Sequence, residues 1–135
     1  MTIDDLRKHI DTIEESYEYF LAYAAQGLSG DGASASGGGE LREYLKRTDE
    51  ALTAFMDDMD GVAAGFEPAD AYQDAGDVIQ RDASDTRAAV RLVMAQSAVS
   101  SQLIDNLNAS IHFRALLTDL FLFDEVLKTS AQQAG

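Results

Sequence analysis

The chain of 135 residues contains no cysteine and no tryptophan, and Pro68 is its single proline. Without cysteine, disulfide bonds and thiolate metal sites are excluded, and a reducing compartment, the cytoplasm, is the expected location. No run of about 18 apolar residues occurs, so we expect no membrane-spanning helix. The N-terminal region carries the acidic residues Asp4 and Asp5 and lacks a continuous apolar region, so we expect no secretory signal peptide.

Basic residues are scarce as well: 10 lysines and arginines stand against 24 aspartates and glutamates, which gives a net charge of −14. Residues 1–86 hold 20 acidic and 6 basic side chains, whereas residues 87–135 hold four of each. Such a surface repels the phosphates of nucleic acids and anionic membranes, so neither is expected as a direct partner. We expect a basic protein partner instead. A high-salt source is the alternative explanation of the acidity.

Apolar residues recur every three or four positions from Ile3 to Ala24, which predicts an amphipathic helix. Thr2 and Asp5 have the spacing of a capping box at its start, and Gly27 is expected to end it. The same periodicity continues along the chain, so the sequence predicts an all-α protein, a single-domain antiparallel four-helix bundle over residues 1–135. The expected helices span residues 3–26, 40–64, 68–107 and 110–131.

The boundaries of the third helix are the hardest to place. Gly76 and the segment "DASD" make residues 76–84 a candidate interruption, because glycine and aspartate are poor helix formers. Beyond that segment no glycine or proline occurs until Gly135. We place the turn before the last helix at "NLNAS", where asparagine suits a helix end and Ser110 suits an N-cap. The serines at Ser97, Ser100 and Ser101 are interpreted as small residues that allow helices to approach.

The stretch "GLSGDGASASGGG", residues 27–39, invites comparison with a phosphate-binding loop. Such a loop follows a buried strand and enters a helix through Gly-Lys-Ser/Thr, whereas a helix is predicted before this stretch. Glu40 and Glu43 open the next helix and would repel a phosphate. We therefore predict a flexible tether, and about a dozen such residues reach about 40 Å when fully extended.

No motif supports catalysis or a cofactor. Carboxylate di-metal sites in bundles use Glu-x-x-His, but Leu6 and Ala109 stand three positions before His9 and His112. We therefore expect a non-catalytic protein with no cofactor and no metal. The alternative is a small-molecule- or metal-binding bundle, with or without enzymatic activity, whose site lies between helices near His112 and Tyr17. A single metal ion would use His112 with Asp105 or Asp119.

The leading hypothesis is an acidic helical interaction or assembly protein. Tyr19 and Tyr23 lie off the main apolar stripe of the first helix, beside Glu14, Glu15 and Glu18. Tyrosines and carboxylates together suit an arginine-bearing partner, so these five residues form the predicted partner-binding face. The alternative is that the two tyrosines flank the bundle core. A mimic of DNA that sequesters a DNA-binding protein is a further alternative.

The last helix is apolar on nearly all sides, which indicates that it is buried nearly all round. A terminal helix of a small monomeric bundle is rarely covered so fully. We therefore predict a homodimer built on this helix. Its expected interface consists of Phe113, Leu117, Phe121, Leu122 and Val126.

Overall fold

The computed structural model describes residues 1–30 and 35–134, which are helical apart from short turns. The all-α class is confirmed, and no strand occurs in these two ranges. Five helices are packed together where four were expected. They are α1 (Ile3–Ala25), α2 (Ala35–Ala63), α3 (Ala69–Met94), α4 (Ser101–Ala109) and α5 (Ile111–Ala134).

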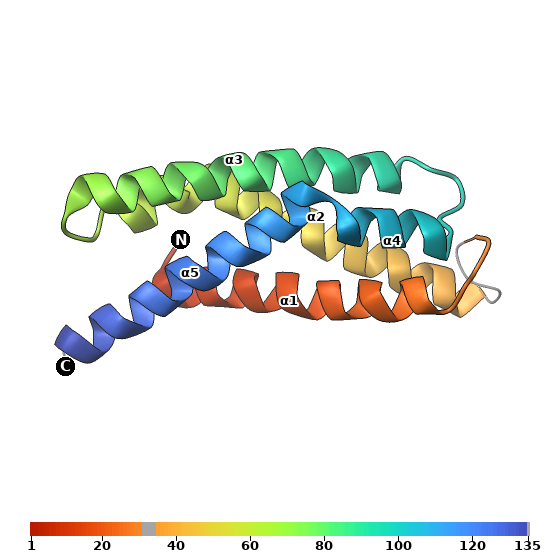
Figure 1. The fold of residues 1–135 in the computed structure, drawn as a ribbon, viewed down its shortest axis with the longest axis horizontal. Helices are drawn as coiled ribbons and strands as arrows, with labels where there is room; N and C mark the ends of the chain where they lie inside the picture. Colours follow the sequence, from red (N-terminus) through yellow and green to blue (C-terminus); the bar gives the residue numbers. More distant parts are fainter. Residues whose placement is uncertain (31–34, 135) are drawn as a thin grey trace.

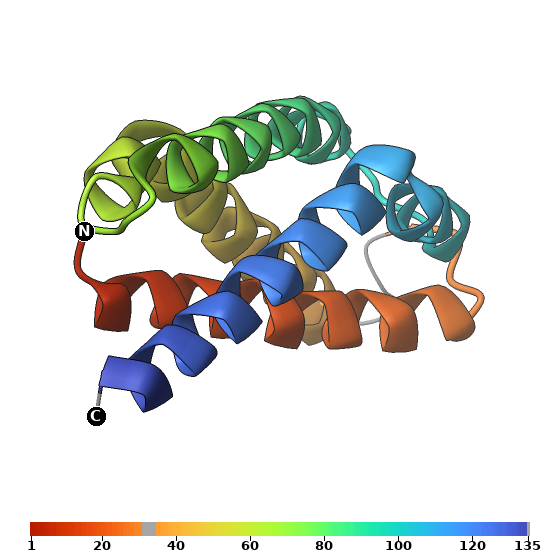
Figure 2. The ribbon, with the colours of Figure 1, turned by 60° about the vertical axis from the view of Figure 1, so that its left-hand side comes forward.

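The chain reverses direction after α1, after α2 and after α3, and α4 and α5 together form the returning fourth arm (Figure 1). α2 packs along α3, while α1 packs against both α2 and α4. α5 packs on α3 and crosses α1, which brings the end of the chain near the beginning of α1 (Figure 2). The expected fourth arm is therefore made of two helices with a bend between them.

The expected helix over residues 68–107 is wrong in its boundaries. α3 continues without interruption through 76–84, and the break lies at 95–100 instead. Gly76 is buried within α3, where a Cβ atom would lie 3.4 Å from the Cβ of Ala63. Gly76 therefore lies at the contact between α2 and α3, where a Cβ atom would make ordinary van der Waals contact, and it does not end the helix.

The break at 95–100 is stabilised by a residue distant in the sequence. Arg42 of α2 donates hydrogen bonds to the carbonyl oxygens of Met94 and Gln96, at 2.9 and 2.8 Å. The last carbonyls of a helix have no partner inside the helix, so a guanidinium placed there stabilises the helix end. A tertiary contact therefore fixes the end of α3.

The serines after the break do more than provide space. The side chain of Ser100 is the N-cap of α4 and accepts a hydrogen bond from the backbone N–H of Leu103. The Ser101 hydroxyl accepts a hydrogen bond from the N–H of Leu28 at 2.8 Å and donates one to the carbonyl of Tyr23 at 2.7 Å. These bonds join the end of α1 to the beginning of α4.

Three predicted helix ends are confirmed. The capping box at the start of α1 is present, with Thr2 and Asp5 each bonded to the other's backbone. Gly27 follows the end of α1 with φ of 69°, a conformation that glycine adopts most readily. Ser110 is the single residue between α4 and α5.

The predicted tether, residues 27–39, is only partly covered by the described structure. α2 begins at Ala35, so residues 35–39 are helical. Residues 31–34 lie outside the described residues. The carbonyl of Leu28 accepts a hydrogen bond from the N–H of Ser101 at 2.9 Å, which fixes the first part of the connection to α4.

Candidate functional site

The two tyrosines of the predicted partner-binding face pack in or against the core of the protein. Tyr23 is 1% exposed, and its hydroxyl lies 2.7 Å from the carbonyl oxygens of Gly30 and Val99. Tyr19 is half-buried, and its ring stacks on Tyr44 with the centroids 4.2 Å apart. The structure therefore places both tyrosines where the core interpretation puts them.

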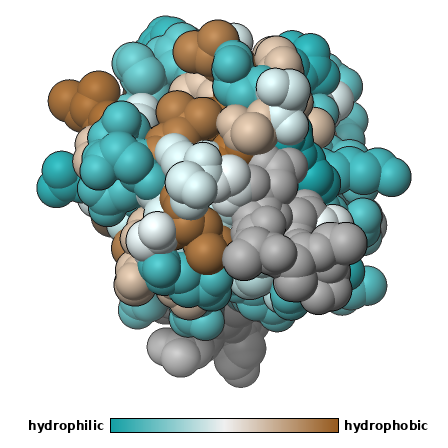
Figure 3. All heavy atoms as spheres, turned by 90° about the vertical axis from the view of Figure 1, so that its right-hand side faces the viewer, coloured by the Kyte–Doolittle hydropathy of each residue, from teal (hydrophilic) through white to brown (hydrophobic). Residues whose placement is uncertain are grey.

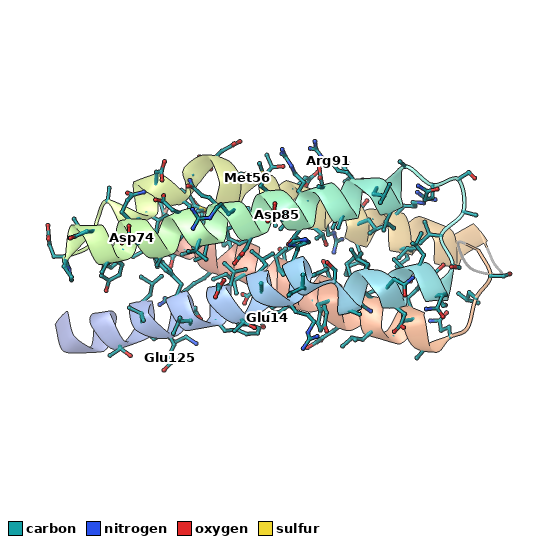
Figure 4. All side chains as sticks on the ribbon, turned by 45° about the horizontal axis from the view of Figure 1, so that its top comes forward. Glu14, Met56, Asp74, Asp85, Arg91 and Glu125 are labelled. Carbon is teal, nitrogen blue, oxygen red and sulfur yellow. The ribbon has the colours of Figure 1, made fainter. Side chains whose placement is uncertain are left out.

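The three glutamates of that face remain at the surface. Glu15 and Glu18 are exposed and take part in no ion pair within the described ranges. Glu14 is half-buried (Figure 4), and burial raises its pKa, as do the charges of Asp11 and Asp124. This face of α1 thus offers negative charge but no aromatic anchor.

The structure buries two residues of the predicted dimer interface and exposes the other three. Phe113 and Leu117 are 0% and 8% exposed inside the single chain, and the Phe113 ring lies 5.3 Å from that of Tyr17. They pack in the monomer core because α1 and α3 cover that side of α5, so they are not available to a second chain. The other predicted residues are exposed, at 48% for Phe121, 66% for Leu122 and 39% for Val126.

An apolar groove lies between α3 and α5. The two helices separate toward the end of α5 in both ribbon views (Figures 1 and 2). The space between them has a volume of about 390 Å³. α3 contributes Ala71, Tyr72, Ala75, Val78 and Ile79 to its lining. α5 contributes Asp119, Leu122, Phe123 and Val126.

The groove exists because the facing part of α3 carries small residues. Ala71 and Ala75 are four positions apart and therefore lie on the same side of the helix. Tyr72 is held between two rings: it stacks on Phe66 with the centroids 4.9 Å apart and meets Phe123 edge-on at 6.1 Å. The tyrosine thus forms a rigid wall, while the alanines leave the groove open.

A pair of carboxyl groups lies at one end of the groove. Asp119 lines it, and Asp82 stands one helical turn beyond Val78 on α3. Burial, with the hydrogen bond and charge of Asp119, raises the pKa of Asp82 to about 7. Within the described residues no other donor reaches the buried Oδ2 of Asp82. The two carboxyls can hydrogen-bond only when one is protonated, so the pair keeps a shared proton to a higher pH than an isolated aspartate does.

His112 of α5 lies farther along the contact between α3 and α5. Its Nδ1 is 3.8 Å from Oδ2 of Asp85, and both side chains are more than half exposed. The expected partners Asp105 and Asp119 do not form this pair. No group of three or more metal-ligating side chains occurs in the described residues, and the Tyr17 ring packs on the core. The alternative site near His112 and Tyr17 thus gains no support.

The two helices on either side of the groove, α3 and α5, are acidic on their outer sides. Asp74 and Asp85 are exposed on α3, and Glu125 is exposed on α5 (Figure 4). Lys128 of α5 is bonded to Asp124 at 3.2 Å and so has its charge partly balanced. The groove is therefore an apolar surface surrounded by negative charge.

At the end of the molecule near the α3–α4 connection, the residues drawn in colour in Figure 3 show no comparable apolar surface. In the part of that face drawn in colour, apolar residues lie in separate places among hydrophilic ones (Figure 3).

None of the described helices combines the length and apolarity needed to cross a membrane. The chain matches no known protein family, no curated protein and no solved structure.

Proposed function

We propose that this protein is a non-catalytic acidic interaction protein of the cytoplasm, which binds a basic amphipathic helix of a partner protein between α3 and α5. The observation that carries the proposal is the open apolar groove with its acidic surroundings. Leu122 lines the groove and is 66% exposed, and an exposed apolar surface gathered in a groove is typical of an interaction site. Grooves between helices commonly accept the apolar face of a further helix.

The size of the groove suits a few side chains. Its volume of about 390 Å³ lies near the lower end of the range for ligand pockets, about 300–1,000 Å³. A helix that presents apolar residues at i, i+3 and i+4 could insert them between Val78 and Leu122. The rest of the helix would then lie over the exposed carboxylates.

Charge selects the occupant of the groove. With a net charge of −14 on the whole chain, a basic partner is attracted and a second copy is repelled. A homodimer through Phe121, Leu122 and Val126 would bring two acidic surroundings together. We therefore assign the groove to a basic partner, and self-association is the competing outcome of the experiment below.

The experiment uses a fluorescein-labelled amphipathic peptide with leucines on one face and lysines on the other, and with no histidine or acidic residue. Binding is followed by fluorescence anisotropy. Leu122→Glu places a charge in the groove and should weaken binding at least about tenfold, or about 1.4 kcal/mol. Phe121→Glu is the matched control, because it adds the same charge to an exposed apolar position of α5 that does not line the groove.

The two variants separate the possible results. Loss of binding in Leu122→Glu with retention in Phe121→Glu supports the groove. Equal effects of the two variants, or no binding by the parent protein, overturn it. Native mass spectrometry of the parent protein adds a second readout: a dimer that Leu122→Glu converts to a monomer means that a second copy occupies the groove.

A further inference from the structure

The contact between α3 and α5 carries ionisable groups in a fixed order. Asp85 meets His112 first, Asp82 and Asp119 follow, and the apolar groove begins beside Asp119. The groove therefore has two different ends. One end is closed by a carboxyl pair, and the other is apolar and lies near Val126.

The two carboxyls of the pair differ in their access to the groove. Asp119 lines the groove, whereas Oδ2 of Asp82 is buried behind it. The charged groups that act on Asp82 are Asp85 and Arg81 from α3 and Asp119 from α5. Arg81 is exposed, and His112 pairs with Asp85. A cation that enters the groove would therefore meet Asp119 directly and Asp82 at short range.

We propose that Asp82 and Asp119 together receive one lysine or arginine side chain of the docked helix, and that its arrival releases to the solvent the proton that the two carboxyls share. This inference rests on the proposed function and adds a specificity-determining pair to it. The apolar residues of the partner then occupy the groove toward Val126. The partner thus needs its cation at one end of its apolar stripe.

The physical reason lies in the repulsion between two carboxylates. Ionising both groups in a partly desolvated place costs free energy, and a nearby positive charge lowers that cost. A cation against Asp119 supplies that charge, so the complex favours the doubly ionised pair. Because the free protein must lose a proton to bind, affinity rises with pH below about 7 and levels off above it, by up to about tenfold per pH unit.

The position of the cation gives a second consequence. A lysine placed one helical turn from the first leucine, on the side that faces Asp119, should bind best. Moving that lysine to the opposite end of the leucine stripe leaves the charge and composition of the peptide unchanged. We expect this register change to weaken binding several-fold at pH 8 and to remove the dependence on pH.

The test measures affinity for the labelled peptide by anisotropy between about pH 5.5 and 8.5, and proton release by calorimetry in two buffers of different ionisation enthalpy. The intact chain should bind about fivefold more tightly at pH 7 than at pH 6 and release close to one proton at pH 6. Asp82→Asn should flatten this dependence, because no proton is then shared between two carboxyls. Asp74→Asn, an equal loss of charge on the exposed side of α3, should keep it. His112→Gln should keep it too.

The outcomes distinguish this inference from the function on which it rests. Binding that is independent of pH in the intact chain overturns the inference and leaves the groove as the docking site. The same holds if His112→Gln alone removes the dependence on pH, because the imidazole is then the titrating group. Absence of binding at every pH overturns both.

Discussion

Replacing Asp82 by asparagine should change how the stability of the free protein depends on pH. The pKa of Asp82 is raised from 3.8 to about 7 in the folded protein. The folded state therefore holds a proton that the unfolded chain releases at lower pH, so this group's contribution to stability is largest below pH 3.8 and is lost as pH rises to about 7. Above about pH 7 the contribution is constant.

The size of this loss of stability follows from the part of the pKa shift of Asp82 that lies within the pH range of the measurement. Between about pH 5.5 and 7, a range of about 1.5 pH units, the folded state keeps a proton that the unfolded chain has lost. Each pH unit corresponds to about 1.4 kcal/mol, so the loss of unfolding free energy is about 2 kcal/mol before solvent screening is considered. The site is partly open to solvent, which weakens the repulsion. We expect the intact protein to lose about 1–2 kcal/mol of unfolding free energy over this range through Asp82.

Urea unfolding followed by circular dichroism at 222 nm measures this loss, since the chain contains no tryptophan. An asparagine amide can donate a hydrogen bond to Asp119 at every pH, so Asp82→Asn should gain about 1–2 kcal/mol relative to the intact protein between about pH 5.5 and 8. Asp74→Asn is the control for a general reduction in negative charge. Parallel pH curves for the intact protein and Asp82→Asn would refute the shared proton.

Two further predictions concern hydrogen bonds made by residues at the end of the break at 95–100. Tyr23→Phe removes the hydroxyl that lies 2.7 Å from the Val99 carbonyl and should destabilise the protein by about 1–2 kcal/mol in urea unfolding. Tyr44→Phe keeps the stacked ring and should cost less than about 0.5 kcal/mol, so equal losses would contradict the role of the buried hydroxyl. Ser100→Ala removes the N-cap that binds Leu103 and should cost about 1 kcal/mol, whereas an unchanged melting curve would show that the cap contributes nothing.

Much of the helical structure could be predicted because its signals are local. The capping box at Thr2 and Asp5, the end of α1 at Gly27 and the turn at Ser110 each depend on a few adjacent residues. The break at 95–100 could not be predicted in the same way. It contains no glycine or proline, and it depends on Arg42 from another helix.

The side chains of the site were harder to assign than the helices that carry them. Periodicity placed Tyr23 off the apolar stripe of α1. Its buried hydroxyl bonds to two carbonyl groups from loops, and a helical pattern cannot give the position of those loops. The last helix is apolar on several sides, from which burial nearly all round was predicted. Its sequence could not show that the bundle covers Phe113 and leaves Leu122 exposed. The pairing of Asp82 with Asp119 also requires the register between α3 and α5.

Amide chemical-shift mapping tests the central claim most directly. The isotope-labelled protein is titrated with the basic amphipathic peptide, and backbone shifts are followed along the whole chain. If the groove is the docking site, the largest changes fall in residues 71–79 and 119–126. Changes confined to the outer face of α1 around Glu15 and Glu18 would contradict the groove and return the partner to the acidic surface of that helix.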